Sequence, residues 1–114
     1  MTRGQVELLQ GTLELLVLKT LTLGRRHGYA IVQQIHETTD DVLRIEEGSL
    51  YPALHRMEAR GWIASDWSVS ENNRRAKFYR LTRAGRKQLR DKQSAWLRLS
   101  EATHKILALP SKGA

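Results

Sequence analysis

The order of the elements between residues 48 and 85 constrains this chain more than any other feature. Four apolar residues spaced i, i+3, i+4 and i+7 predict a short amphipathic helix. They are Leu50, Ala53, Leu54 and Met57. Two runs rich in aromatic and β-branched residues, at 62–69 and 76–81, predict strands, and the polar segment between them holds two asparagines suited to a turn. The stretch therefore predicts a helix followed by a β-hairpin with a basic tip.

The predicted helix has a mostly polar and basic exposed side. Ser49 is the expected N-cap, and Pro52 is acceptable because it falls in the first turn, where backbone N–H groups lack helical partners. Gly61 is expected to end the helix. The side chains outside the buried face are Ser49, Tyr51, Pro52, His55, Arg56 and Arg60.

A helix of this kind fits the major groove of DNA, where its N-terminal residues usually reach the base edges. We expect Tyr51 to supply an apolar contact or a hydrogen bond, and Arg56 to bind a phosphate or a guanine. The alternative is that Tyr51 only packs against a neighbouring helix and that the charges are solvated. A helix followed by a basic hairpin is typical of a winged helix-turn-helix, which favours the contact with DNA.

The hairpin tip is the second predicted DNA element, because Arg74, Arg75 and Lys77 cluster beside the turn. Such a wing lies along phosphates or reaches into a minor groove, and it supplies affinity and salt dependence more than sequence information. A run of solvated charges is the alternative.

Two further helices are expected before residue 48. Thr12 is the predicted N-cap of a helix that reaches residue 23, with Leu13 and Leu16 on its main stripe. This helix is apolar around much of its girth, which indicates either dimerisation or ordinary burial within one domain. A second helix is expected from residue 28 to about residue 37. The acidic segment 38–47 should face away from DNA, because phosphate would repel it.

The last predicted helix is capped by Thr82 and runs to about Leu109, where Pro110 stops it. Leu89, Trp96 and Thr103 are spaced by sevens, and so are Lys92, Leu99 and Ile106, as in a helix–helix seam. Together with the first helix it predicts a dimer interface made by Leu13, Leu16, Leu89, Trp96, Leu99 and Ile106. Trp96 either fills this interface or, with Leu99, lines a cavity where a flat aromatic effector could stack.

Composition narrows the partner to a polyanion. The 114 residues carry a formal net charge of +7 with an isoelectric point of about 10.3, which favours nucleic acid ahead of an acidic membrane surface. No cysteine is present, so disulfides and thiolate chemistry are excluded. The apolar run near the start is too short to span a bilayer and lacks the pattern of a signal peptide. We therefore expect a cytoplasmic protein without a membrane partner.

Enzymatic chemistry is not expected. The four histidines are scattered, no glycine-rich phosphate loop or nucleophile motif is present, and the adjacent Glu46 and Glu47 would point apart on a regular element. The sequence therefore predicts no catalytic residue, no metal site and no cofactor.

Three segments resemble the signatures of the PadR-type transcriptional regulators. They are HGYAI at residues 27–31, GSLYPALHRMEARGWI at 48–63 and RRAKFYRLTRAG at 74–85. The order and spacing of the three motifs make the resemblance specific, and the single helix after them resembles the short subfamily. One departure is Asn72-Asn73, where relatives commonly carry Asn-Gly.

The resemblance implies a homodimeric repressor that binds a roughly palindromic operator and is often released by a small-molecule effector. It implies that Tyr51 and the basic wing contact DNA and that Tyr29 approaches a phosphate. In some short relatives, aromatic compounds lie between tryptophans at the dimer centre, and Trp96 falls in the corresponding helix.

The resulting prediction is a mainly α protein with a small β-hairpin, a winged helix-turn-helix over 1–81, a dimerisation helix over 82–110 and a tail over 111–114. Its expected partners are double-stranded DNA, a second copy and a small aromatic effector. The rival functions are a winged-helix module for a protein or an anionic membrane, and non-specific architectural binding of DNA. The expected DNA contacts are Tyr29, Ser49, Tyr51, Pro52, His55, Arg56, Arg74, Arg75 and Lys77.

Overall fold

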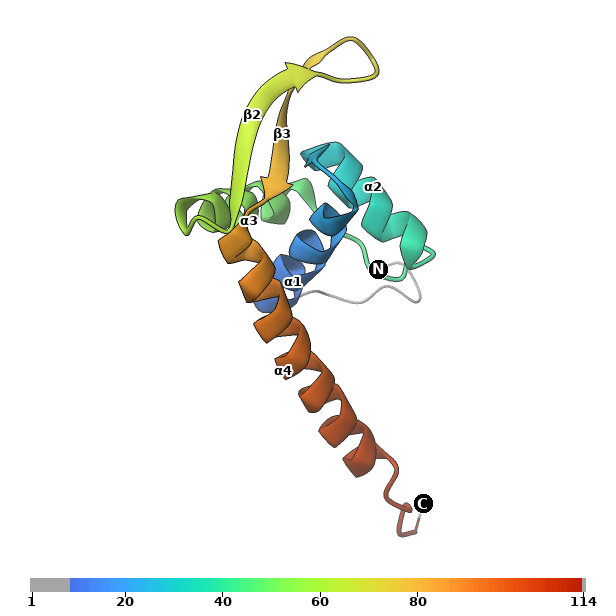
Figure 1. Ribbon diagram of the computed structural model, residues 1–114. Coiled ribbons are helices and arrows are strands. Elements are labelled where there is room, and N and C mark those ends of the chain that lie inside the picture. The colour runs from blue at the N-terminus through green and yellow to red at the C-terminus, as the bar shows by residue number, and fades with distance from the viewer. Residues whose placement is uncertain (1–8, 114) are drawn as a thin grey trace.

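A computed structural model describes residues 9–113 (Figure 1). Two parts of the chain lie outside the described residues. They are residues 1–8, at the start of the predicted winged helix-turn-helix region, and residue 114 of the predicted tail. The elements in chain order are α1 (Gln10–Thr20), a short 3-10 helix (Leu21–Leu23), β1 (Arg26–His27), α2 (Gly28–Thr38), α3 (Glu47–Ala59), β2 (Ile63–Val69), β3 (Arg75–Leu81) and α4 (Arg83–Leu107).

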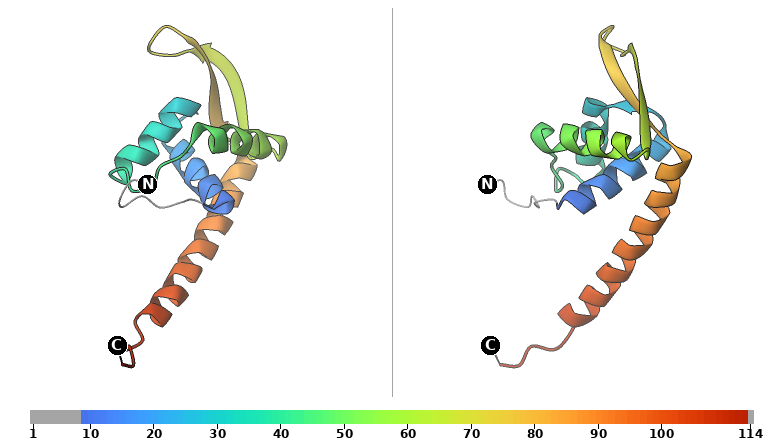
Figure 2. Two further views of the ribbon diagram at one scale, coloured as in Figure 1. Left: turned by 180° about the vertical axis from the view of Figure 1, so that it is seen from behind. Right: turned by 90° about the vertical axis from the view of Figure 1, so that its left-hand side faces the viewer.

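Helices α1, α2 and α3 pack together beneath a three-stranded antiparallel sheet of order β1-β3-β2. Strands β2 and β3 extend well beyond the helices as a twisted hairpin, the wing (Figures 1 and 2). This arrangement confirms the predicted fold class, a mainly α winged helix with a small β-hairpin, and adds a third strand, β1, that the sequence did not predict.

The core confirms the helical spacing on which the α3 prediction was based. Leu50, Ala53, Leu54 and Met57 have no solvent exposure. Leu18 of α1 and Ile31 of α2 are equally buried and belong to the same apolar cluster. One face of each helix therefore meets the others in a single core, and the opposite side of α3 is left for other contacts.

Two predicted helix starts are wrong. Helix α1 begins at Gln10 after Leu9, with no side-chain cap, so Thr12 is not its N-cap. Helix α3 begins at Glu47, since the Ser49 and Leu50 amides both donate to the Glu46 carbonyl at 2.9 and 3.0 Å. Ser49 therefore lies inside the first turn of α3. Both helix starts are exposed to solvent, so water can accept hydrogen bonds from the free backbone amides in place of a capping side chain.

Pro52 consequently lies in the second turn of α3, whereas the sequence predicted it in the first turn. Its missing N–H leaves the carbonyl of Gly48, four residues earlier, without its helical partner. Gly48 is exposed, so that carbonyl can be hydrated. The helix ends as expected, with Gly61 at a φ of 77°.

The segment between α2 and α3 folds as a turn against the core. Asp40 and Asp41 adopt positive φ angles, and Leu43 and Ile45 then pack inward while Val42 remains exposed. The Ile45 amide donates to His36 Nε2 at 2.9 Å. This loop, which carries Asp40 and Asp41, lies at the end of α2 that is away from the wing (Figure 1).

Helix α4 leaves the domain body after its first turns. Thr82 caps it as predicted, with its Oγ1 accepting from the Gly85 amide at 3.0 Å. Leu89 is buried against the core, whereas every described residue from 93 onwards is exposed. The helix therefore projects as an isolated rod, which gives the chain extents of 60 × 32 × 21 Å (Figure 2).

Candidate nucleic-acid interface

The exposed side of α3 divides into two flanks with different neighbours. The wing flank carries Tyr51, His55 and Glu58 and faces β2 and β3. The α1 flank carries Ser49, Pro52, Arg56 and Arg60; its first three residues line a hollow with Gln10 and Leu13 of α1. The structure therefore separates Tyr51 and His55 from Arg56, although the sequence placed all three on one exposed side.

On the wing flank, Tyr51 packs on the start of α2. A Cβ added at Gly28 would lie 3.0 Å from the Tyr51 hydroxyl, so the lack of a side chain at Gly28 allows the close approach of the ring. Tyr51 is still 48% exposed and Tyr29 is 60% exposed. Packing on a neighbouring helix and access from outside are thus compatible for Tyr51.

The two tyrosines share a notch of about 400 Å³ between α2, α3 and the wing. Its lining residues are His27, Gly28, Tyr29, Tyr51, Trp67, Ala76, Lys77 and Tyr79. Burial and the nearby charge of Glu58 raise the pKa of Tyr79, so its hydroxyl stays neutral at the floor of the notch. The notch combines aromatic faces, hydroxyl groups and one lysine, which suits a sugar–phosphate backbone.

Glu58 is a residue of this flank that the sequence did not single out. Its Oε2 accepts a hydrogen bond of 2.5 Å from Ser65 Oγ on β2, and its Oε1 lies 3.4 Å from Lys77 Nζ on β3. The Ser65 hydrogen bond and the charge of Lys77 lower the pKa of Glu58 despite its partial burial. Lys77, an expected DNA contact, is therefore paired with an ionised carboxylate.

The α1 flank is built around Glu14, whose side chain is 4% exposed. Its carboxylate lies 3.6 Å from Arg56, 3.6 Å from Arg60 and 3.7 Å from Lys92 of α4. In the sequence Glu14 only interrupts an apolar run, so nothing there identified it as a partner. Arg56, an expected DNA contact, is directed to this carboxylate.

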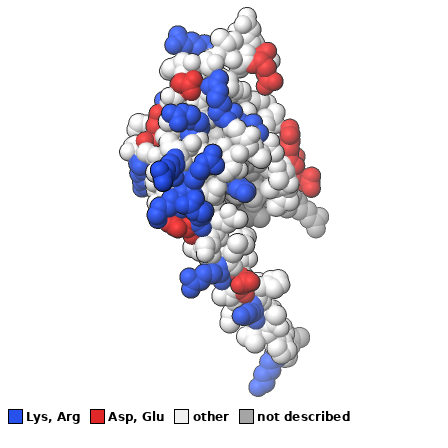
Figure 3. Space-filling model, in the orientation of Figure 1, with Lys and Arg blue, Asp and Glu red and all other residues white. Residues whose placement is uncertain are grey.

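The outer wing carries the remaining basic residues. Arg74 and Arg75 are exposed, and the Arg75 guanidinium lies 5.3 Å from the centre of the Trp67 ring. In the strand register Trp67 pairs with Lys77 and Val69 pairs with Arg75, so these four side chains share one face of the wing. Trp67 and Val69 are both exposed there. Figure 3 shows Lys and Arg side chains near the free end of the wing and, more densely, over the junction of α3 with α4.

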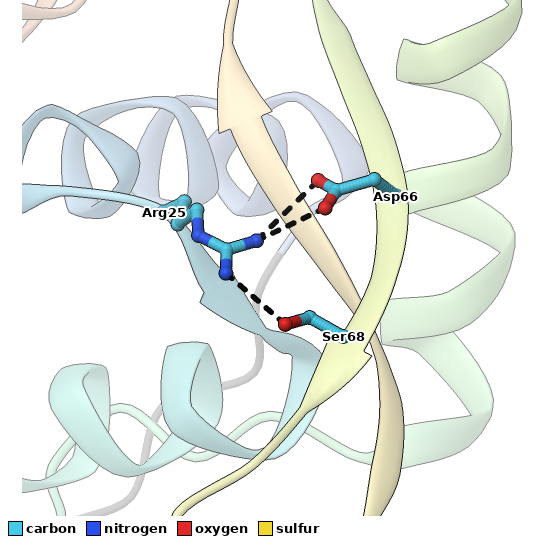
Figure 4. Close-up of polar contacts among 3 residues, drawn as sticks. All are labelled: Arg25, Asp66 and Ser68. Atoms are coloured by element: carbon cyan, nitrogen blue, oxygen red, sulfur yellow. Dashed lines mark hydrogen bonds and ion pairs between the residues drawn. The ribbon is translucent and has the colours of Figure 1, made fainter.

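The opposite face of the wing is braced to the loop before β1. Arg25 Nη1 lies 3.2 Å from Asp66 Oδ2, and Arg25 Nη2 donates to Ser68 Oγ at 3.3 Å (Figure 4). The guanidinium also lies 4.5 Å from the centre of the Phe78 ring. These contacts, made to both strands of the wing, hold the hairpin at a defined angle to the helical body.

Comparison with known proteins identifies the family. The family model described as the transcriptional regulator PadR-like family matches residues 17–91, which include α2, α3 and the whole wing. The chain belongs to the PadR-like family of transcriptional regulators. Regulators of this family bind DNA and commonly dimerise.

Individual relatives agree with this membership. A crystal structure of a PadR family transcriptional regulator from Eggerthella lenta is 34% identical, covers 89% of this chain and 86% of its own, and has a TM-score of 0.73. A transcriptional regulator from Clostridium thermocellum is 31% identical over 84% of this chain and 93% of its own, with a TM-score of 0.77. A transcriptional regulator of Mycobacterium tuberculosis is 35% identical over 82 residues, which are 72% of this chain and 60% of that protein.

In this PadR-like chain the residues expected at a dimer interface occupy two environments. Leu13 and Leu89 are buried in the chain's own core, and Leu16 packs partly against it. Trp96, Leu99 and Ile106 are exposed along α4. An open, largely apolar groove of about 320 Å³ lies between the start of α1 and the middle of α4. It is lined by Leu9, Gly11, Thr12, Leu15, Lys92, Ala95, Trp96 and Leu99.

Two negative findings concern residues 9–113 of this PadR-like regulator. No helix there is long and apolar enough to cross a membrane. In the same range, no three residues of the types His, Cys, Asp and Glu come together as a possible metal site.

Proposed function

We propose that this PadR-like regulator is a homodimeric repressor that binds a roughly palindromic operator. Helix α3 of each subunit enters a major groove, and the wing lies on the backbone or in the adjacent minor groove. The observation that carries the proposal is the wing flank: exposed Tyr51 shares a notch with exposed Tyr29 and with Lys77 of the wing, and exposed His55 follows Tyr51 one helical turn later. An arrangement of this kind offers base contacts in the middle and phosphate contacts on both sides.

The DNA contacts fall into two classes in this proposal. Tyr51, with His55, Ser49 and Pro52 of the same helix, lies nearest the base edges. Tyr29 at the start of α2 and the wing residues hold the backbone. Arg56 joins them by exchanging Glu14 for a phosphate when DNA approaches. The wing residues in this set are Arg74, Arg75 and Lys77.

A second copy is proposed to cover the exposed part of α4. Trp96, Leu99 and Ile106 are apolar and solvent-exposed, and they lie on the part of α4 that extends beyond the domain body. Residues 1–81 then act as the DNA-binding unit and 82–110 as the dimerisation helix, with 111–114 as a tail. Sedimentation at micromolar concentration tests this part: a dimer supports it, and a monomer contradicts it.

The operator experiment compares two variants that should fail differently. Binding is measured to a promoter fragment of the protein's own gene and to random duplex, over a series of salt concentrations. Tyr51→Ala should reduce the preference for the promoter by about 1–3 kcal/mol, since it removes a contact at base level. Arg75→Ala should weaken binding to both duplexes alike and reduce the salt slope by about one. Arg44→Ala, in the acidic loop, is the matched control.

The outcomes separate this proposal from its rivals. Equal affinity of the unmutated protein for promoter and random duplex would favour non-specific architectural binding. An absence of DNA binding would favour a module for a protein or an anionic membrane. If Tyr51→Ala and Arg75→Ala both bind the promoter as the parent does, the assigned DNA face is wrong.

The effector is proposed to be a flat aromatic molecule that stacks on Trp96 beside Leu99 at the centre of the dimer. The proposal is supported by the exposed indole and the apolar groove around it. Because Trp62 and Trp67 also fluoresce, quenching by candidate compounds is compared between the parent and Trp96→Phe. Quenching that persists unchanged in Trp96→Phe contradicts this site.

A further inference from the structure

We propose that Glu58 determines how strongly this regulator prefers its operator. Its carboxylate fixes the wing against α3, and its charge offsets Lys77, which holds down the affinity for random duplex. This inference rests on the DNA face assigned under the proposed function and adds a residue that opposes binding to that face.

The first part follows from the position of Glu58 between three elements. It lies on α3 two turns after Tyr51, and its two carboxylate oxygens reach different strands of the wing. Oε2 accepts from Ser65 on β2 at 2.5 Å, while Oε1 faces Lys77 on β3 at 3.4 Å. One side chain therefore sets the separation between the groove-binding helix and both strands of the wing.

The second part follows from the charges at the DNA face. Lys77 has a side chain that is 39% exposed, and its Nζ also lies 5.8 Å from the centre of the Tyr79 ring. Glu58 is ionised at neutral pH, because Ser65 and Lys77 both favour the charged form. A phosphate that approaches Lys77 must therefore compete with a carboxylate and is repelled by it.

These two effects act differently on the two kinds of DNA. Random duplex is bound mainly through phosphate contacts, so the negative charge of Glu58 directly lowers the affinity for it. The operator is also held by contacts at the base edges, which depend on a correct angle between α3 and the wing. Glu58 therefore lowers random binding through its charge and supports operator binding through its position.

The test uses Glu58→Gln in the full-length protein, with the promoter fragment and random duplex as probes. Random duplex should bind about three to ten times more tightly at physiological salt, with a salt slope steeper by about one, because one more phosphate contact is fully neutralised. Binding to the promoter should gain less or weaken, so the ratio of the two affinities falls. Equal gains for both probes, or an unchanged salt slope, would overturn the proposal.

Two further variants separate charge from position. Ser65→Ala removes the hydrogen bond but keeps the carboxylate, so it should weaken promoter binding while leaving the salt slope unchanged. Glu58→Gln combined with Lys77→Gln should return the salt slope to that of the parent, because the released cation is gone. A double variant that keeps the steep slope would show that Lys77 is not the group that Glu58 offsets.

A matched control is available on α4. Asp91 pairs with Lys87 at 2.9 Å on an exposed surface, so Asp91→Asn changes the net charge by the same amount away from the wing. It should alter the ratio of affinities much less than Glu58→Gln does. Failure of the proposed function is distinguishable, because the parent would then show no preference for the promoter, whatever Glu58→Gln does to the salt slope. Thermal unfolding of each variant checks that it is folded.

Discussion

Beside each flank of α3 lies one carboxylate that faces basic side chains, Glu14 of α1 on one side and Glu58 of α3 itself on the other, and these two carboxylates lie in opposite environments. Glu14 on the α1 flank has a side chain that is 4% exposed and is surrounded by Arg56, Arg60 and Lys92. The side chain of Glu58 on the wing flank is 31% exposed and forms an ion pair with Lys77. The same helix is thus tied to the domain body on one side and to the wing on the other.

Burial decides what each cluster can do. Attraction to a buried carboxylate is weakly screened, so the three cations around Glu14 hold α1, α3 and α4 together even at high salt. The pair between Glu58 and Lys77 is open to water and salt, so it contributes little to stability and can be exchanged for a phosphate. The α1 flank therefore contributes more to stability, and the wing flank carries the ion pair that a phosphate can displace more easily, although Arg56 of the α1 flank also belongs to the proposed DNA contacts.

The largest expected effect is that of Glu14→Gln on stability. The substitution leaves three cations near one another without their counter-charge and places an amide where the structure offers few hydrogen-bond partners. We expect the free energy of unfolding to fall by about 1–3 kcal/mol. Urea denaturation followed by circular dichroism measures it. Glu58→Gln is the comparison and should lose under about 1 kcal/mol; equal losses for the two would abolish the distinction between the flanks.

The second prediction changes the wing flank without changing a charge. In Gly28→Ala the new Cβ would lie 3.0 Å from the hydroxyl of Tyr51, and this end of the ring can move because it is exposed. The free energy of unfolding should change by under about 1 kcal/mol, whereas the preference for the promoter should drop by about 1 kcal/mol as Tyr51 is displaced.

Gly11→Ala is the matched control for Gly28→Ala. A Cβ at Gly11 meets nothing within 4 Å, and the residue lies inside α1. Alanine there should stabilise the protein by up to about 1 kcal/mol and leave DNA binding unchanged. If Gly28→Ala also leaves the promoter preference unchanged, the position of Tyr51 on Gly28 has no role in recognition.

The sequence predicted the helices α1 to α4 and the hairpin because local patterns determine them, but it did not predict the two-residue strand β1. The buried face of α3 follows from spacing alone, and the Thr82 cap follows from one hydroxyl before a helix. The starts of α1 and α3 could not be predicted in the same way, since neither has a side-chain cap to mark it. Boundaries that depend on hydration leave no signal in the residues.

The division of α3 into two flanks could not be predicted, because it depends on partners distant in the chain. Spacing shows that Arg56 lies outside the core, but its pairing with Glu14 depends on how α1 crosses α3. Glu58 likewise acquires its role from the strand register that brings Ser65 and Lys77 to one face of the wing. The sequence alone shows that the proposed DNA-binding surface is positively charged. Which of its lysines and arginines can bind a phosphate depends on the tertiary contacts that pair some of them with carboxylates.

The smallest expected effect is the pH dependence of the contribution of Glu58 to stability. Ser65, Lys77 and His55 all favour its ionised form and lower its pKa below the ordinary glutamate value of 4.5. A carboxylate with a lowered pKa stabilises the folded state above its unfolded pKa, and this contribution is lost as the pH falls through the folded value. The difference in unfolding free energy between the parent and Glu58→Gln should therefore be under about 1 kcal/mol at pH 7 and should decrease as the pH is lowered below the ordinary glutamate value of 4.5. Urea denaturation across this range measures it, and a difference that stays constant would mean that shape, and not charge, links Glu58 to the wing.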